Sequence, residues 1–494
     1  MKLLQVLCST LLIFNLNITM QAQQLDHASP LRTFPVFHRN QFLGVQPSRS
    51  IPPIPKATVS PGFGGAAYTV GPTVSATSTK PEAEEEIAAD PLDDTMLVGA
   101  ISDFSLRGGF NTTKYTLSTN NGSTWKQAFI PRNSAGLPLT SDGATWQANS
   151  DPVVAIDRLG NYYIADLYVK VNSSGNATND GFYVTRGNLS TGTTTTAANT
   201  KPVLTHLSAT SLFEDKPWIA VDNSTNATTT GNGYACWTHF TANSDMIFFS
   251  RSTNHGSSWS SAIQVSPSAQ NGGVQGCQVA AGTKGEVYVS WEVFFTTGQA
   301  QIWIAKSTNG GGTFTTKVAA TAKFNPVNFS AIYRDNSFPA LAVNPSSGFV
   351  YIVYADQPGA NSAIEFTRDT TAAGTVFTTP VKINDQTAGQ RVFPAISVDS
   401  AGILGVSWFD TRNSPTNANK YDVFATRSLN NGGTFAPNAR VTASTISLGN
   451  STSAFIGDYS GMTGGMEAHP VWTSGGFGNG STAPLGGMKT AKLD

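Results

Sequence analysis

One eight-residue pattern occurs four times in the chain and constrains its fold more than any other feature. Each copy reads Ser-x-Asn-x-Gly-x-(Ser/Thr)-(Trp/Phe), and the copies span residues 118–125, 252–259, 307–314 and 428–435. The Asn side chain can hydrogen-bond the backbone of a tight turn, and the Gly permits a positive φ. The aromatic residue can then pack between sheets. We therefore interpret each copy as a turn between two strands, with weaker copies near Thr185 and Arg368.

A second pattern repeats over a longer distance. A short apolar strand passes through a Gly or Asn turn into another strand that usually ends in Trp or Tyr, in seven units: 86–90 with 96–100, 151–157 with 162–166, 215–222 with 234–237, 277–281 with 287–291, 338–343 with 350–354, 393–398 with 404–408, and 458–462 with 469–472. Strand repeats spaced roughly 55 to 67 residues apart are typical of a β-propeller with four strands per blade. The sequence predicts an all-β propeller of seven blades, or of six if the first or last unit is not a true blade.

The ends of the chain are expected to close this ring. The last unit has room for only three strands, the third at 487–491, whereas residues 66–75 alternate like a strand. Supplying the missing outer strand from residues 66–75 would leave no open sheet edge. The predicted propeller therefore spans residues 66–494.

Composition agrees with many short strands and excludes some partners. Only 12% of the residues are charged, 47 are Gly, and the net charge is -1. A bulk electrostatic nucleic-acid binder needs a basic surface, so we expect no nucleic-acid partner. The 39% hydrophobic content can fill a large core, which argues against disorder through most of the chain.

The N-terminus is typical of a secreted protein. Lys2 precedes an apolar stretch, and residues 20–22 end it with a small residue, so we interpret residues 1–22 as a signal peptide. Residues 23–65 are rich in Pro and Ser and read as a linker. No later segment is apolar for long enough to span a membrane. We expect a secreted, cell-surface or periplasmic protein.

Two cysteines remain once Cys8 has left with the signal peptide. Cys236 and Cys277 lie on strands of adjacent repeats and are a candidate disulfide in an oxidising compartment. Two free buried thiols are the alternative.

Propeller geometry predicts which polar residues share one face. The segment before each inner strand and the segment after each second strand reach the same side of the ring. The first group contains Glu85, Asp151, Glu214, Asp215, Arg334, Asp335, Arg391 and Asp458, and the second contains Asp103, Asp166, His239, Glu292, Asp356, Asp410 and Arg412. In a chain with so little charge, this concentration predicts a carboxylate-rich cup as the place for function.

The repeated turn resembles the Asp-box, or bacterial neuraminidase repeat, of sialidases and related propellers. That repeat usually reads Ser-x-Asp-x-Gly-x-Thr-Trp, so this chain has Asn where Asp is usual. Residues 410–413, 421–428 and 455–461 also resemble secreted bacterial sialidase-like propellers. The resemblance covers about residues 83–494. It implies an exo-acting glycoside hydrolase that removes terminal sialic-acid-type sugars from a glycan or glycoprotein.

The resemblance also implies roles for particular residues. Three arginines would bind the sugar carboxylate, a Tyr activated by a Glu would be the nucleophile, and an Asp would be the acid. The positional matches are Arg334, Arg391 and Arg412 for the arginines, Tyr459 with Glu292 for the nucleophile pair, Asp151 or Asp215 for the acid, and Asp410 and Asp458 as further substrate contacts. The family's Phe-Arg-Ile-Pro motif is absent, since residues 129–132 read Phe-Ile-Pro-Arg.

Structural roles are an alternative for the same residues. The aspartates can cap backbone N–H groups, Arg412 can form a salt bridge to a neighbouring blade, and Tyr459 can pack in the channel. The competing function is a non-catalytic propeller that binds glycans or proteins through the same face. We expect a monomer without a cofactor. His239 lacks zinc-ligand spacing. The clustered carboxylates could hold Ca²⁺, although no Asp-x-Asp-x-Asp loop supports it.

Overall fold

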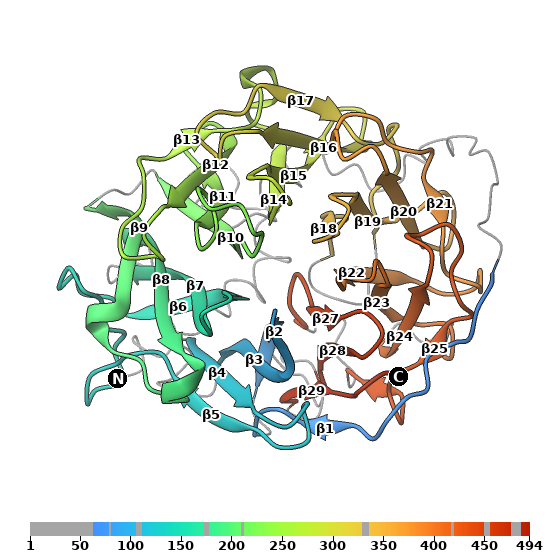
Figure 1. The fold of residues 1–494 in the computed structure, drawn as a ribbon, viewed down its shortest axis with the longest axis horizontal. Coiled ribbons are helices and arrows are strands. Elements are labelled where there is room, and N and C mark those ends of the chain that lie inside the picture. Colours follow the sequence, from blue (N-terminus) through green and yellow to red (C-terminus); the bar gives the residue numbers. More distant parts are fainter. Residues whose placement is uncertain are drawn as a thin grey trace, which may run out of the picture.

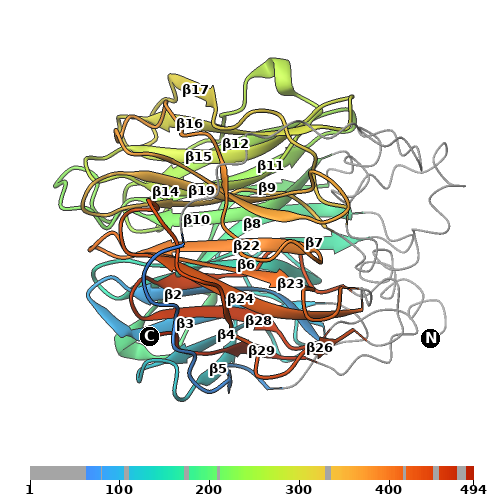
Figure 2. The same ribbon diagram turned by 90° about the vertical axis from the view of Figure 1, so that its right-hand side faces the viewer.

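A computed structural model describes residues 63–78, 81–104, 111–171, 177–208, 212–328, 335–415, 419–448, 455–475 and 486–494. These residues form seven antiparallel sheets arranged in a ring, which confirms the seven-bladed propeller (Figure 1). Figure 2 turns the ring onto its side and shows the strands running across its thickness. The expected signal peptide and most of the linker, residues 1–62, lie outside the described residues. No helix in the described part of the chain is long and apolar enough to cross a membrane.

Blades 1 to 3 each contain four strands in sequence order from the channel outward. Blade 1 has β2 (Glu82–Asp90), β3 (Asp93–Asp103), β4 (Thr112–Ser118) and β5 (Lys126–Phe129). Blade 2 has β6 (Ala148–Ile156), β7 (Asn161–Val171), β8 (Ala177–Asn188) and β9 (Thr200–Leu207). Blade 3 has β10 (Phe213–Val221), β11 (Gly233–Phe240), β12 (Asp245–Ser252) and β13 (Ile263–Gln264).

Blades 4 to 6 follow the same order. Blade 4 has β14 (Val274–Ala281), β15 (Val287–Phe294), β16 (Ala300–Ser307) and β17 (Thr316–Ala319). Blade 5 has β18 (Ala340–Val343), β19 (Val350–Asp356), β20 (Ala363–Asp369) and β21 (Val381–Lys382). Blade 6 has β22 (Arg391–Val398), β23 (Leu404–Asp410), β24 (Lys420–Ser428) and β25 (Ala439–Arg440), and β26 (Ile446–Ser447) also pairs with β24.

Blade 7 joins the two ends of the described chain. It contains β27 (Met462–Gly464), β28 (Ala468–Thr473) and β29 (Met488–Thr490), with β1 (Val74–Ser75) as its outermost strand. Residue 74 pairs with Thr490 and residue 75 with Lys489, both antiparallel. The predicted closure of the ring by residues 66–75 is therefore confirmed, and no edge of β29 stays unpaired on that side.

Neighbouring blades pack through their inner strands and a layer of aromatic side chains. β2, β6, β10, β14, β18, β22 and β27 each contact the next inner strand around the ring. The second strands of blades 3, 4, 6 and 7 each contain a buried tryptophan: Trp237, Trp291, Trp408 and Trp472. Burying an aromatic side chain removes a large apolar area from water, so these residues supply much of the core between sheets. The second-strand Trp or Tyr of the longer repeat therefore belongs to this core.

The four copies of the repeated motif form the same hydrogen-bonded turn between the third and fourth strands. In blade 1, the Ser118 hydroxyl oxygen accepts the Gly122 N–H at 2.9 Å, and the Asn120 side-chain oxygen accepts the Thr124 N–H at 2.9 Å. Gly122 has φ +75°, a conformation that favours glycine. In this turn, side-chain oxygens of Ser and Asn accept the backbone N–H groups that would otherwise need a backbone carbonyl partner.

A disulfide connects two blades. Cys236 on β11 and Cys277 on β14 are bonded, with 6.3 Å between their Cα atoms. The bond joins the second strand of blade 3 to the inner strand of blade 4, so it crosses a blade interface.

Inner strands share a backbone irregularity near the channel. Pairing of the first two strands shifts register after residues 83, 150, 215, 275 and 392, in blades 1, 2, 3, 4 and 6. At each shift one residue has a positive φ, namely Glu84, Asp151, Lys216, Gly276 and Phe393. A left-handed conformation is costly for a residue other than glycine and persists only where the surroundings hold it. Three of these strained residues are charged and meet in the channel.

Candidate functional site

The channel contains a buried ionic cluster built around Lys216. Its Nζ lies 3.1 Å from a Glu84 oxygen and 2.8 Å from an Asp151 oxygen, and it also contacts Asp458. All four side chains are buried. They come from four consecutive blades of the ring: 7, 1, 2 and 3. The cluster therefore fastens these blades together at the channel, and we name it the Lys216 cluster.

Electrostatics keep this lysine charged. Burial lowers the pKa of Lys216, but the nearby carboxylates of Asp151, Asp458 and Glu84 outweigh that effect and raise it well above its ordinary value. Three carboxylates face one ammonium group, so the cluster has an excess of negative charge when all of them are ionised. A buried ion pair of this kind is a weak source of net stability, yet removing one partner is costly.

Tyr459 lies beside the Lys216 cluster. Its hydroxyl donates a hydrogen bond to the Pro152 carbonyl oxygen at 3.0 Å, and its ring meets the Trp218 ring edge-on at 5.8 Å. Lys216 Nζ lies 5.9 Å from the centre of the Tyr459 ring. Burial raises the pKa of Tyr459 well above its ordinary value, and the carboxylates of Glu84 and Asp151 raise it further. Both effects keep the phenol neutral, which opposes a role as an ionised nucleophile.

Of the two other expected catalytic residues, Asp215 directly precedes Lys216 and its charge also acts on that lysine, whereas Glu292 lies on the next blade. Asp215 on β10 accepts a hydrogen bond from the Gln275 side chain at 3.3 Å, across the interface of blades 3 and 4. Glu292 lies directly opposite Gln275 in the pairing of β15 with β14, and it is fully buried. The hydrogen bond and ring contacts of Tyr459 go instead to blades 2 and 3. The structure therefore places Asp151, Asp458 and Tyr459 together, and Asp215 and Glu292 together by way of Gln275.

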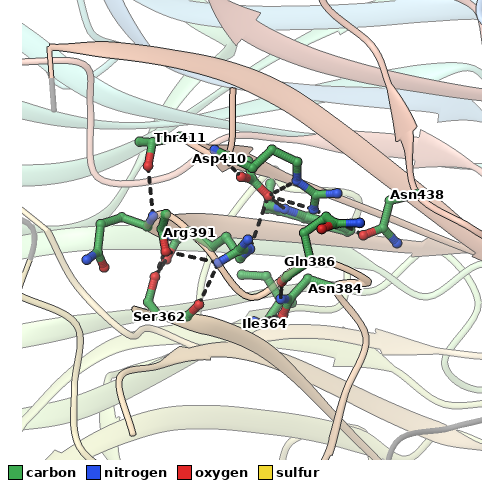
Figure 3. Close-up of polar contacts among 12 residues, drawn as sticks. Ser362, Ile364, Asn384, Gln386, Arg391, Asp410, Thr411 and Asn438 are labelled. Atoms are coloured by element: carbon green, nitrogen blue, oxygen red, sulfur yellow. Dashed lines mark hydrogen bonds and ion pairs between the residues drawn. The ribbon is translucent and has the colours of Figure 1, made fainter. Parts of the chain in front are cut away.

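Two of the three expected arginines meet at one carboxylate. Arg391 Nε lies 3.1 Å from Asp410 Oδ2, and Arg412 donates to the same oxygen from Nε at 2.9 Å and from Nη2 at 2.7 Å. Figure 3 shows Arg391 and Asp410 within their network of polar contacts. Asp410 is fully buried and also accepts the indole N–H of Trp408 at 2.8 Å. The arginines thus converge on an oxygen of the protein itself.

The remaining donors of these guanidinium groups are also occupied. Arg391 Nη1 donates to the Ser362 carbonyl oxygen at 2.9 Å, and its Nη2 donates to the Ala388 carbonyl oxygen at 2.7 Å. Arg412 Nη1 pairs with Asp385 at 2.5 Å, and Asp385 follows the last strand of blade 5. Arg412 therefore forms a salt bridge to a neighbouring blade, which is the structural role that the sequence analysis gave as the alternative to substrate binding. The third arginine, Arg334, lies outside the described residues.

Sequence reasoning missed three polar residues that the structure brings to this face. Lys216 and Glu84 belong to the Lys216 cluster, and His206 ends the outermost strand of blade 2. His206 Nε2 and His239 Nδ1 each lie 2.7 Å from the same oxygen of Glu214. A signal for Lys216 was present, because Lys216-Pro217 occupies the same place in its repeat as Asp151-Pro152. His206 lies outside the repeated inner strands, so no repeat pointed to it.

No protein-family model matches the chain, and no curated protein sequence matches it. Several solved structures are similar to it in fold. A Dyadobacter fermentans protein of unknown function has 12% identity and a TM-score of 0.46, over 86% of this chain and 99% of that one. An ulvan lyase of polysaccharide lyase family PL25 has 10% identity and a TM-score of 0.47, over 85% and 95%. A Hadza microbial sialidase has 13% identity and a TM-score of 0.40, over 84% and 66%.

Proposed function

We propose that the protein is a glycan-binding propeller that recognises neutral sugars at the channel, beside the Lys216 cluster. The observation that carries this proposal is the partly exposed aromatic pair Trp218 and Tyr459 next to buried carboxylates. An apolar aromatic surface with a few fixed polar groups is the usual composition of a small-molecule site. Sugar hydroxyl groups can donate to carboxylate oxygens while the ring stacks on an aromatic side chain.

Charge favours a neutral sugar over a sialic acid. The Lys216 cluster contains three carboxylates for one lysine, so its net charge is negative. It repels the carboxylate of a sialic acid unless other cations neutralise that charge. The two described arginines that would compensate are committed to Asp410, Asp385 and backbone carbonyl oxygens. A sialoside would have to displace those internal partners.

Hydrolysis is the second candidate function, and one observation favours it. Asp151, Asp458 and Tyr459 meet around Lys216, so a candidate acid and a candidate nucleophile lie close together. For an exo-acting sialidase-type mechanism, bound substrate would have to take the Tyr459 hydroxyl away from the Pro152 carbonyl and lower its pKa. The binding proposal requires neither change.

A paired assay tests the two functions. Wild-type protein is screened for binding to an array of neutral and sialylated oligosaccharides and for hydrolysis of a fluorogenic sialoside. We expect binding to neutral glycans, no turnover, and at least about a tenfold loss of binding in Trp218→Leu. Trp303→Leu, in the third strand of blade 4, is the matched control and should bind like wild type.

Two results would decide against the binding proposal. If the wild-type protein binds none of the neutral glycans on the array, the binding proposal is wrong. Sialoside turnover by wild type that disappears in Tyr459→Phe would establish the hydrolase instead.

We also propose that the protein works outside the cytoplasm. The support is the expected signal peptide at residues 1–22 and the Cys236–Cys277 bond, since disulfides persist in oxidising compartments. N-terminal sequencing of the protein recovered from its producing cells should begin near residue 23. A start at Met1 would contradict the proposal.

A further inference from the structure

A second constellation lies where blade 2 leads into blade 3. His206 is at the end of β9, Glu214 is near the start of β10, and His239 is opposite Glu214 on β11. The start of an inner strand and the end of its neighbour share one face, so these residues lie on the same face as the expected cup. They are separate from the Lys216 cluster and from the arginines at Asp410.

Ligand-type atoms converge closely at this position. Nε2 of His206 and Nδ1 of His239 each lie 2.7 Å from Oε1 of Glu214, and the three atoms all lie within 4.8 Å of one another. Glu214 is fully buried, and its other oxygen, Oε2, has no hydrogen-bond partner among the described residues. A buried carboxylate oxygen without a partner is costly. A bound cation would compensate that cost.

We propose that His206, Glu214 and His239 bind a divalent transition-metal ion of the zinc type. Two imidazoles and one carboxylate are a known set of three protein ligands for Zn²⁺, with a fourth position open to water or another ligand. Ca²⁺ and Mg²⁺ prefer sites made of oxygen atoms alone, so two imidazole ligands favour a transition metal.

The two His–Glu distances require only a small adjustment, and the separation of the two His nitrogens, which is at most 4.8 Å, would have to shorten toward the same value. Ligands at about 2.0 to 2.2 Å from a tetrahedral ion lie roughly 3.3 Å from one another, so each His–Glu separation would widen by about 0.6 Å. His206 is the ligand nearest to solvent, with 16% of its side chain exposed, and gives the ion a route of entry. The fourth coordination position would then take water or an oxygen of a bound molecule.

Neighbouring groups hold two of the ligands in place. The Glu214 backbone N–H donates to both oxygens of Asp180, at 3.1 and 2.8 Å. The His239 ring stacks on Phe248, with 4.4 Å between ring centres and 8° between planes. Outer contacts of this kind fix the orientation of metal ligands and strengthen binding.

Metal titration of the purified full chain tests the proposal. After treatment with EDTA and removal of the chelator, Zn²⁺ is titrated by calorimetry and Co²⁺ by its visible absorption. We expect one ion per chain and weaker binding at low pH, because the imidazoles must be neutral to bind. His206→Gln and Glu214→Gln should each weaken Zn²⁺ binding by at least about tenfold.

Controls separate a lost ligand from a lost fold. Each variant is checked by circular dichroism, and His206→Gln is the more tolerant variant because its side chain is partly exposed. His255→Gln removes another histidine beside a carboxylate, since His255 Nδ1 lies 3.6 Å from Asp157, and it should leave Zn²⁺ binding unchanged. No Zn²⁺ binding by wild type, or wild-type affinity in both folded ligand variants, would overturn the proposal.

Discussion

Lys216 is the cation that three carboxylates of the channel share. Lys216→Met leaves Glu84, Asp151 and Asp458 close together without their shared cation. We expect the free energy of unfolding at pH 7 to fall by about 3 to 5 kcal/mol, as for other broken buried pairs. Urea denaturation of both proteins measures the difference. Lys126→Met, at an exposed position on β5, should change stability by less than about 0.5 kcal/mol.

The pH dependence of this variant gives a second readout. In wild type the pKa of Lys216 is raised above its ordinary value of 10.5, so its contribution is complete at any pH below 10.5 and is lost only as the pH rises above it. In Lys216→Met the remaining carboxylates hold protons more tightly when folded, so the variant should recover stability as the pH falls from 8 to 5. An equal deficit at both pH values would contradict the assignment of the cluster.

Asp166 on β7 is expected to make the protein less stable at alkaline pH. Burial raises its pKa to about 8, although hydrogen bonds from Thr113 and Asn149 oppose the shift. The folded state therefore keeps a proton that the unfolded state loses near pH 4. The free energy of unfolding falls by about 1.4 kcal/mol for each pH unit as the pH rises from about 4 to about 8. Asp166→Asn mimics the protonated acid and should flatten this dependence. Urea titrations at pH 6 and pH 9 would contradict the prediction if both proteins lost the same stability.

Individual site residues could be predicted only in part. The repeat predicts that Asp151 and Asp458 share a face, the family resemblance adds Tyr459, and the three residues do lie together. Which of two adjacent residues faces the channel could not be predicted, because the register shift within each inner strand breaks the alternation of faces. The partners of Arg391 could not be predicted either, since they include backbone carbonyl oxygens that carry no side-chain signal. His206, Glu214 and His239 come from two blades, so they have no regular spacing in the sequence that would predict a shared site.

At the scale of the element, the repeated turn should depend on its serine. Ser307→Ala removes the hydroxyl that accepts the buried Gly311 N–H at 3.0 Å and donates to Asn309 at 2.8 Å. An unpaired buried N–H costs about 1 to 2 kcal/mol, and we expect that loss in the free energy of unfolding. Thr308→Ala changes the next residue, which is exposed, and should be nearly neutral. Equal stability of the two variants would show that the turn does not need the hydroxyl.

Strands and turns were the most predictable elements. In all four copies the Asn side chain accepts a backbone N–H of the turn, as predicted. The Ser hydroxyl oxygen, whose role the sequence did not predict, accepts the N–H of the motif Gly. The lengths of the inner strands were less predictable. In blade 1 the first two strands extend to Glu82 and Asp103, beyond the apolar residues, because both carboxylates are buried and pair with Lys114 on β4.

At the scale of the whole molecule, the ring is closed by residues 63–76, which are far in sequence from the strands of blade 7 that they complete. Besides the β1–β29 pairing, the Tyr68 hydroxyl donates to the Gly465 carbonyl oxygen at 2.8 Å, and Arg427 Nε donates to the Ala66 carbonyl oxygen at 2.9 Å. Tyr68 is buried against the core of blades 5 to 7. Residues 63–76 therefore work as part of the propeller, although they precede its first inner strand.

Removing this segment should open the ring. Deleting residues 1–75 exposes the β29 edge and the pocket of Tyr68, and an exposed edge promotes association with other chains. We expect the midpoint of thermal unfolding to fall by on the order of 5 °C and light scattering to detect oligomers. Deleting residues 1–62 keeps every described contact of the segment and serves as the control, which should melt like the chain that begins at residue 23. If both deletions melt at the same temperature and stay monomeric, then blade 7 is stable with three strands and closure by β1 contributes nothing measurable.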